Sequence, residues 1–263
     1  MFPRSESLIE LWHYRELLWF LAWRDIKVRY KQTILGAAWA VLQPLLGTLA
    51  FSAVFTRLGV SSHVGVPYPL FTYCALLPWT YFSATLVQGG NSLVTHSRLL
   101  TKVYFPRVLL PASVALSGLL DFAVGSGVLL ALMVYYGVRP GWTIVLVPFV
   151  VIAMWLVTLA ISMFLAALNV RYRDVRYAIP FLVQLGLFLT PIIYPITALS
   201  GRVQRLAALN PIAAIVESLR ACLFPQHQVA PGLLLESSAV ALAICALSAL
   251  YFHATERMFA DIV

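Results

Sequence analysis

The stretch LGVSSHVGVPYPLFTYCALLPWTYFSATLVQGGNSLVTHS, residues 58–97, contains no Asp, Glu, Lys or Arg. A helix that crosses the hydrocarbon core of a membrane needs about 20 mostly apolar residues, so this stretch is long enough to hold one. The whole sequence of 263 residues has the same character: 61% is hydrophobic, 11% is charged, and the mean hydropathy is +0.88. Soluble domains carry about 25% charged residues. The composition therefore excludes a soluble protein and indicates an integral membrane protein.

Six segments are apolar enough to cross a membrane. They are residues 34–56, 68–91, 110–136, 143–169, 177–197 and 232–253. The segments lack the alternating ten-residue pattern of a membrane β-barrel, which favours helices. We therefore expect an all-α membrane protein in which residues 34–263 form a transmembrane domain with six transmembrane helices. An even number of spans places both termini on one side.

The basic residues are divided unequally between the two faces that six spans define. Thirteen lie on the face that carries the termini and five on the other. Cytoplasmic loops carry the excess of Lys and Arg, so both termini are expected in the cytoplasm. A net charge of +8 could suggest a nucleic-acid partner, but the placement of most basic residues on one membrane face argues against it, and we expect none. Cys74, Cys222 and Cys245 lack the spacing of metal ligands, and no metal site is expected.

The N-terminal segment, residues 1–33, precedes the first span. Within it, residues 8–30 are predicted to form a helix with one apolar and aromatic stripe, made by Leu8, Leu11, Trp12, Trp19, Ala22, Trp23, Ile26 and Tyr30. Polar side chains lie roughly opposite, at Glu10, His13, Arg24 and Lys27. A Trp-rich face and a basic face are typical of an amphipathic helix that lies on the membrane surface. The pattern leaves open whether this helix only anchors the chain or also docks a partner.

A short basic and aromatic elbow, RLLTKVYFPRVLLP, follows the charge-free stretch at residues 98–111. Pro106 and Pro111 limit any helix there to short pieces. Tyr104 and Phe105 offer apolar contact area, and the cations beside them offer charge. The residues alone leave two interpretations open. The elbow is either an ordinary positive loop or a knob that fits a cleft on a cytoplasmic partner.

Four segments resemble the permeases of type 2 ABC exporters, in the branch that exports polysaccharides such as O-antigen, capsule and teichoic acid. They are WRDIKVRYKQTILGAAWAVLQPLL (23–46), LLTKVYFPRVLLP (99–111), NVRYRDVRYAIPFLVQLGLFLTPIIYPI (169–196) and NPIAAIVESLRACLF (210–224). The resemblance runs from about residue 20 to residue 224. It implies a homodimeric permease of the bacterial inner membrane that moves a lipid-linked glycan. It also implies two copies of a separate ATPase subunit.

The motor is expected on that partner. No G-x-x-x-x-G-K-[ST] phosphate loop occurs in this sequence. We therefore expect no cofactor on this chain and no enzymatic activity of its own, with ATP and Mg²⁺ bound by the ATPase subunit.

The resemblance also implies roles for particular residues. It makes residues 98–108 a coupling loop that seats in the ATPase, through Arg98, Lys102, Tyr104, Phe105, Pro106 and Arg107. It gives a secondary contact with the ATPase or the membrane to Arg24, Lys27, Arg29 and Lys31. It makes residues 198–231 an outer loop with short re-entrant gate helices, marked by Asn210, Pro211, Glu217 and Arg220. Candidate aromatic side chains for a glycan tunnel between two copies are Trp39, Phe51, Trp79, Tyr81 and Phe188.

Physical reasoning supports a short helix in that outer loop. Asn210 followed by Pro211 is a helix start signal. The apolar sequence that follows is too short to span a membrane, which favours a re-entrant or interfacial hairpin. Glu217 and Arg220 are three residues apart and therefore share a helical face. In a gate helix they would pair or hold the gate to a neighbouring subunit. The alternative is an exposed surface ion pair worth under about 1 kcal/mol.

Two features of the spans are unusual. Pro191 and Pro195 each remove a backbone donor, so a break is expected near the outer end of the fifth span. Asp121 lies inside the third span, and a carboxylate there is a functional-site candidate by default. Because the spans offer it no clear cationic partner, we expect Asp121 to be protonated or to lie near a span end.

Three other functions remain open at this point. A type 2 ABC permease for drugs or small lipids is the nearest. A six-span membrane transferase usually needs carboxylates or histidines clustered at one face. Here the histidines are scattered, at His13, His63, His96, His227 and His253, and Asp121 has no acidic companion in the sequence around it. A passive channel would conduct without any ATPase.

Overall fold

The computed structural model describes residues 12–31, 36, 38–57, 65–102, 105–227 and 231–256. In this part of the chain every regular element is helical. The elements are α2 (Arg15–Lys31), α3 (Ala38–Phe55), α4 (Tyr68–Thr95), α5 (Ser97–Lys102), α6 (Leu109–Tyr135), η2 (Trp142–Leu146), α7 (Val147–Arg171), α8 (Val175–Leu189), η3 (Ile196–Ala198), α9 (Gly201–Ala208), α10 (Pro211–Leu223) and α11 (Pro231–Thr255).

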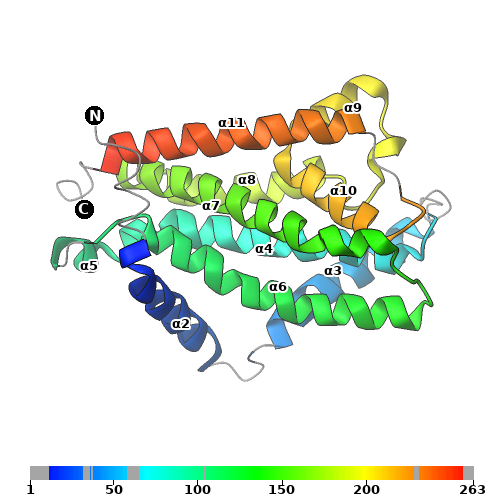
Figure 1. Ribbon diagram of the computed structural model, residues 1–263, viewed down its shortest axis with the longest axis horizontal. Coiled ribbons are helices and arrows are strands. Elements are labelled where there is room, and N and C mark those ends of the chain that lie inside the picture. The colour runs from blue at the N-terminus through cyan, green and yellow to red at the C-terminus, as the bar shows by residue number, and fades with distance from the viewer. Residues whose placement is uncertain are drawn as a thin grey trace.

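The long helices run side by side as an elongated bundle (Figure 1). Within the described ranges, five are long and apolar enough to cross a membrane: α3, α4, α6, the η2–α7 unit and α11. They agree with five of the six predicted spans. The beginning of α2 and the end of α11 lie at the end of the bundle where α5 projects, which we call the elbow end. The opposite end, where α9 and α10 lie, is called the hairpin end.

The predicted fifth span, residues 177–197, is shorter than expected. α8 has 15 residues, which at 1.5 Å per residue is about 22 Å, against about 30 Å for the hydrocarbon core. Thr190 has extended backbone, and the chain then turns through Pro191 and Pro195. The predicted break is confirmed, but it falls directly after Leu189. A sixth membrane crossing stays a prediction.

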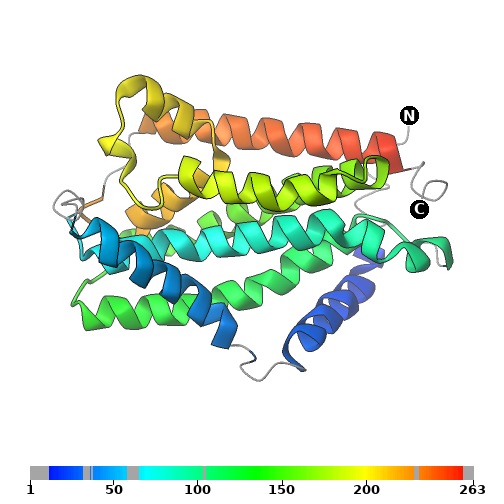
Figure 2. The ribbon, with the colours of Figure 1, turned by 180° about the vertical axis from the view of Figure 1, so that it is seen from behind.

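The hairpin end contains the bent pair α9 and α10. The axes of the two helices meet at 99°. α10 packs against α4, α7 and α11, and α9 lies outside it (Figure 2). The short helices predicted for residues 198–231 are therefore present. Their re-entry into a membrane stays a prediction.

α4 is the central helix, since α3, α6, α7, α8 and α10 all pack against it. Small residues permit this close approach, as is common in membrane bundles. A Cβ atom at Gly89 would overlap the Oγ atom of Ser162 in α7. A Cβ atom at Gly90 would lie 2.7 Å from the Cδ1 atom of Ile179 in α8. These two glycines set the distance from α4 to its neighbours.

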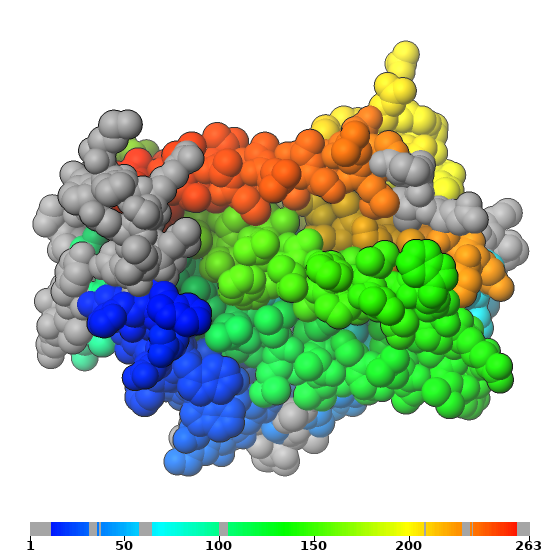
Figure 3. All heavy atoms as spheres, viewed as in Figure 1, coloured from blue at the N-terminus to red at the C-terminus, as the bar shows by residue number. Residues whose placement is uncertain are grey.

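The outer face of the bundle is strongly apolar. α6, α7 and α11 lie next to one another on the face seen in Figure 3. Their exposed large side chains include Leu130, Val134, Phe149, Ile152, Leu242 and Leu247. Such a surface suits lipid or another membrane-embedded chain rather than water. The structure and the composition together describe an all-α, multi-pass membrane protein.

Gly89→Val should destabilise the bundle, because the new side chain would push α7 away from α4. Overpacking of this kind costs about 1–3 kcal/mol. Gly127→Val in α6 is the matched control, since nothing lies within 4 Å of a Cβ atom there. Denaturant titration of both variants in mild detergent measures the difference. Equal stabilities would contradict the tight packing of α4 on α7.

Candidate functional site

The elbow projects from the bundle as α5 and then folds back toward α6 (Figures 1 and 2). Phe105 is only 4% exposed and packs in a cluster with Leu21 of α2, Leu109 of α6 and Phe252 of α11. This corrects the prediction that Phe105 offers contact area to a partner, because its ring is already used inside the chain. Tyr104 and the side chain of Lys102 lie outside the described residues.

Arg107 joins the elbow to the end of α11. Its guanidinium donates to the backbone carbonyl of Glu256, and its backbone N–H donates to the Glu256 carboxylate at 3.4 Å. The carbonyl of Pro106 accepts a hydrogen bond from the backbone N–H of Leu109 at 3.1 Å, where α6 begins. Arg98 lies on the exposed surface of α5. Phe105, Pro106 and Arg107 thus hold the elbow in place, and α5 presents the surface beyond them.

α2 has two apolar faces rather than the single predicted stripe. Leu21 and Ala22 are each 2% exposed, and this face of α2 lies against α6. Trp19 and Trp23 are exposed on the other side, with ring centroids 6.4 Å apart and stacked planes. An exposed Trp surface of this kind suits the membrane interface. Its position on a membrane stays a prediction.

The basic residues of α2 are not equivalent. Arg24 lies 2.9 Å from the Asp25 carboxylate and 2.8 Å from Nε2 of His96, at the end of α4. Lys27 and Lys31 are exposed. Any contact of these residues with an ATPase stays a prediction.

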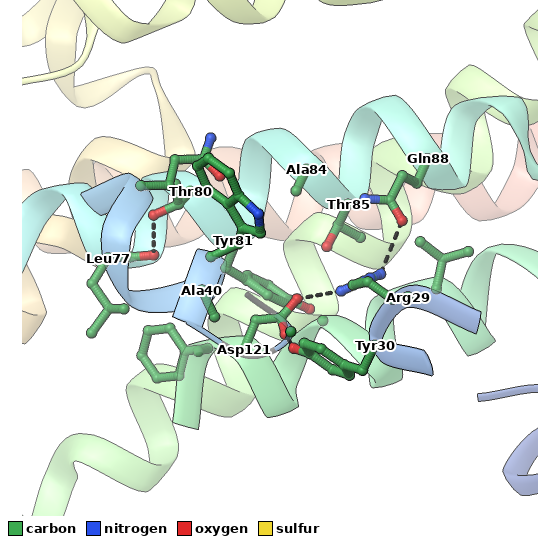
Figure 4. Close-up of a pocket in the computed structure, with 16 residues that line it drawn as sticks. Arg29, Tyr30, Ala40, Leu77, Thr80, Tyr81, Ala84, Thr85, Gln88 and Asp121 are labelled. Atoms are coloured by element: carbon green, nitrogen blue, oxygen red, sulfur yellow. Dashed lines mark hydrogen bonds and ion pairs between the residues drawn. The ribbon is translucent and has the colours of Figure 1, made fainter. Parts of the chain in front are cut away.

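Asp121 obtains its cationic partner from α2. Arg29 donates to Oδ2 of Asp121, and the Tyr30 hydroxyl donates to Oδ1 (Figure 4). The second terminal nitrogen of Arg29 donates to Gln88 of α4 at 2.9 Å. This partner was not predicted, because Arg29 lies in α2, outside the predicted spans. Asp121 also lies well inside α6, which corrects the expectation of a place near a span end.

A cavity of about 210 Å³ lies beside this ion pair, between α2, α3, α4 and α6 (Figure 4). Its polar and aromatic lining includes Trp39, Gln43, Thr80, Tyr81, Thr85 and Gln88. The cavity therefore combines hydrogen-bonding groups with aromatic rings.

At the hairpin end, the predicted start of a short helix is confirmed. The Asn210 side chain accepts from the backbone N–H of Ile212 at 3.2 Å, and Pro211 occupies the first turn of α10. The Asn210 amide also donates to the Thr190 hydroxyl at 2.9 Å. This cap therefore ties the start of α10 to the end of α8.

Glu217 and Arg220 pair as their spacing predicts, but in the interior. Arg220 donates to the Glu217 carboxylate at 2.8 Å. Arg220 is 0% exposed and Glu217 is 1% exposed. The other Glu217 oxygen lies 2.6 Å from Nε2 of His227. The alternative of an exposed surface ion pair is wrong. A buried pair needs further hydrogen bonds to offset the loss of hydration.

Arg220 obtains those bonds from the break after α8. Its terminal nitrogens donate to the carbonyls of Pro191 at 2.7 Å and Ile192 at 2.8 Å. The guanidinium carbon lies 3.4 Å from the centroid of the Phe71 ring in α4, a cation–π contact. One side chain therefore joins α10, the broken end of α8 and α4. His227 and Phe71 carried no sequence signal for this role.

The candidate tunnel aromatics fall into two groups. Trp39 and Phe188 are 53% and 59% exposed. Trp79 and Tyr81 are 6% and 4% exposed, and Phe51 is partly buried against the same core. Trp79 packs tightly against α8 and is not accessible to a ligand, whereas Tyr81 lines the cavity.

Arg220→Ala should lower the free energy of unfolding by about 3–5 kcal/mol, because it leaves two buried carbonyls without their donor and Glu217 with only His227 beside it. Arg202→Ala, on the exposed surface of α9, is the control and should change it by less than about 0.5 kcal/mol. Denaturant titration in detergent gives both values. Similar losses in the two variants would show that Arg220 does not hold the break.

A double-mutant cycle tests the link between α2 and α6. Arg29→Ala and Asp121→Ala should be non-additive, with a coupling of about 0.5–3 kcal/mol in the free energy of unfolding. Arg24→Ala with Asp121→Ala is the control pair, since Arg24 contacts Asp25 and His96 instead. Additive effects for Arg29 and Asp121 would contradict the contact.

Comparison with known proteins agrees with this architecture. The family model described as "ABC-2 type transporter" matches residues 16–224. The O-antigen export system permease protein RfbA of Myxococcus xanthus is 38% identical over 224 residues, which cover 84% of each chain. Two proteins of the same name from Klebsiella pneumoniae are 28% and 27% identical, each over 78% of this chain and 79% of its own length. The matched region includes α2, the elbow, the break after α8 and α10, and the chain therefore belongs to the ABC-2 type transporter family.

Proposed function

We propose that this chain is the permease subunit of an ATP-driven exporter that moves an O-antigen or related lipid-linked polysaccharide across the bacterial inner membrane. The observation that carries the proposal is the similarity to O-antigen export permeases over most of both chains. The chain is a transport subunit, and a separate ATPase binds ATP and Mg²⁺.

In this proposal the elbow end faces the cytoplasm and the chain crosses the membrane six times. The charge distribution supports this orientation, because the elbow end carries most of the basic residues outside the spans. They include Arg24, Lys27, Arg98, Arg107, Arg171, Arg173 and Arg176. α8 would complete the sixth crossing together with the broken segment that follows it.

The ATPase contacts α5. This helix projects beyond the bundle and connects α4 to the rest of the elbow (Figure 1). Because Phe105 is anchored among α2, α6 and α11, a displacement of the elbow would act on those three helices. The exposed basic residues of α2 add a second contact.

Two copies of the chain enclose the glycan path between them, and α9 with α10 forms its outer gate. The contacts of Arg220 support movement of α10 together with the end of α8. The gate would then open as a unit rather than by separate bending of each helix.

The test is co-purification of the tagged chain with its ATPase in mild detergent. Arg98→Glu combined with Lys102→Glu should reduce the bound ATPase at least fivefold and abolish export, because it reverses the charge of α5 (ΔΔG of about 1 kcal/mol or more). Phe105 is left unchanged, since its replacement would damage the core.

Arg139→Glu with Arg202→Glu is the matched control, with the same charge change at the hairpin end. It should leave ATPase binding unchanged. Normal binding and export in the α5 variant would contradict the coupling role of α5. A wild-type chain that co-purifies with no ATPase would contradict the exporter function itself.

A further inference from the structure

The cavity between α2, α3, α4 and α6 is large enough for a ligand. Its volume is about 210 Å³, whereas one water molecule needs about 10–15 Å³. Its walls come from four helices, and Gly36 in the connection between α2 and α3 also lines it (Figure 4). Leu77, Ala84 and Phe122 supply apolar wall. A mostly apolar wall with a few placed polar groups is typical of a small-molecule site.

The polar groups of the cavity suit hydroxyl groups. Gln43, Thr80, Thr85 and Gln88 line it. A side-chain amide offers both donors and an acceptor, and a threonine hydroxyl offers one donor and acceptor lone pairs. A sugar hydroxyl has the same double character. The Gln88 amide oxygen already accepts from Arg29, and the Thr80 hydroxyl donates to the backbone carbonyl of Leu77 at 3.1 Å. The groups that an occupant can meet are therefore chiefly the side-chain amides of Gln43 and Gln88, which a sugar hydroxyl matches better than an acyl chain does.

The charges of the cavity favour a neutral occupant. Among its described lining residues only Arg29 and Asp121 are charged, and they pair with each other. A phosphate or carboxylate that approached the guanidinium would also meet the Asp121 carboxylate. The repulsion between the two anions would offset the attraction to Arg29.

Trp39 supplies a flat apolar surface at the rim. It lies at the start of α3 and is 53% exposed, although it lines the cavity. Pyranose rings have apolar C–H faces that lie well against an aromatic ring. An indole at the rim with amides and hydroxyls behind it is therefore complementary to a sugar, whose faces are apolar and whose edge is polar.

We propose that this cavity, within one subunit, binds a single uncharged sugar ring of the exported glycan, with Trp39 against one ring face and Gln88 with Gln43 at the hydroxyl groups. This site rests on the proposed function, because it takes its ligand from the exported chain. It lies against the Arg29–Asp121 contact, so ligand in the cavity touches the joint between α2 and α6.

Saturation-transfer NMR on the full chain in lipid nanodiscs tests the site. The probes are the methyl glycosides of glucose, galactose, mannose and rhamnose, each at millimolar concentration. At least one should receive saturation, most strongly at the protons of one ring face. Trp39→Ala should weaken its apparent affinity about tenfold, and Gln88→Leu should also weaken it.

The matched control is Trp142→Ala, which removes an indole that is 81% exposed and lies in η2 at the hairpin end. It should leave the transfer unchanged. The site is overturned if no glycoside receives saturation, if Trp39→Ala and Trp142→Ala behave alike, or if inorganic pyrophosphate displaces the glycoside at equal concentration. If the chain retains its ATPase but no glycoside receives saturation, only the proposed site is contradicted. If the chain has no ATPase partner, the proposed export function is contradicted.

Discussion

The organisation of the hairpin end depends on the bonds of one buried guanidinium, that of Arg220. The chain breaks after α8 and leaves the carbonyls of Pro191 and Ile192 outside any regular helix. In a membrane, an unsatisfied backbone group costs several kcal/mol. Arg220 donates to both carbonyls, and Glu217 balances its charge. The break, α10 and the start of α4 are therefore stabilised together.

The elbow end is built differently. There the main contacts are apolar, with Phe105 packed among α2, α6 and α11, and Arg107 closes the cluster against the end of α11. α4 extends from one end of the bundle to the other and has small residues where α7 and α8 cross it. Packed contacts at the elbow end, a continuous central helix and the Arg220 contacts at the hairpin end suit a protein that transmits movement along its length.

Much of this architecture follows from the sequence, because span length and apolarity are local properties. Five spans, the start of α10 and the pairing of Glu217 with Arg220 were predicted. Burial was not, because spacing on a helix face predicts which side chains meet but not what covers them. For the same reason the burial of Phe105 and Trp79 was not predicted, since their neighbours lie far away in the sequence. Asp121 and Arg29 are 92 residues apart, and no local pattern joins them.

The central claim is that the irregular segment around the break is a rigid part of the protein. Hydrogen–deuterium exchange of the wild-type chain in nanodiscs tests it most directly. The account predicts that the backbone amides of α10 and of Ile192 exchange as slowly as those of central α4, although residues 190–195 are not helical. Exchange as fast as that of the exposed α9 would contradict it.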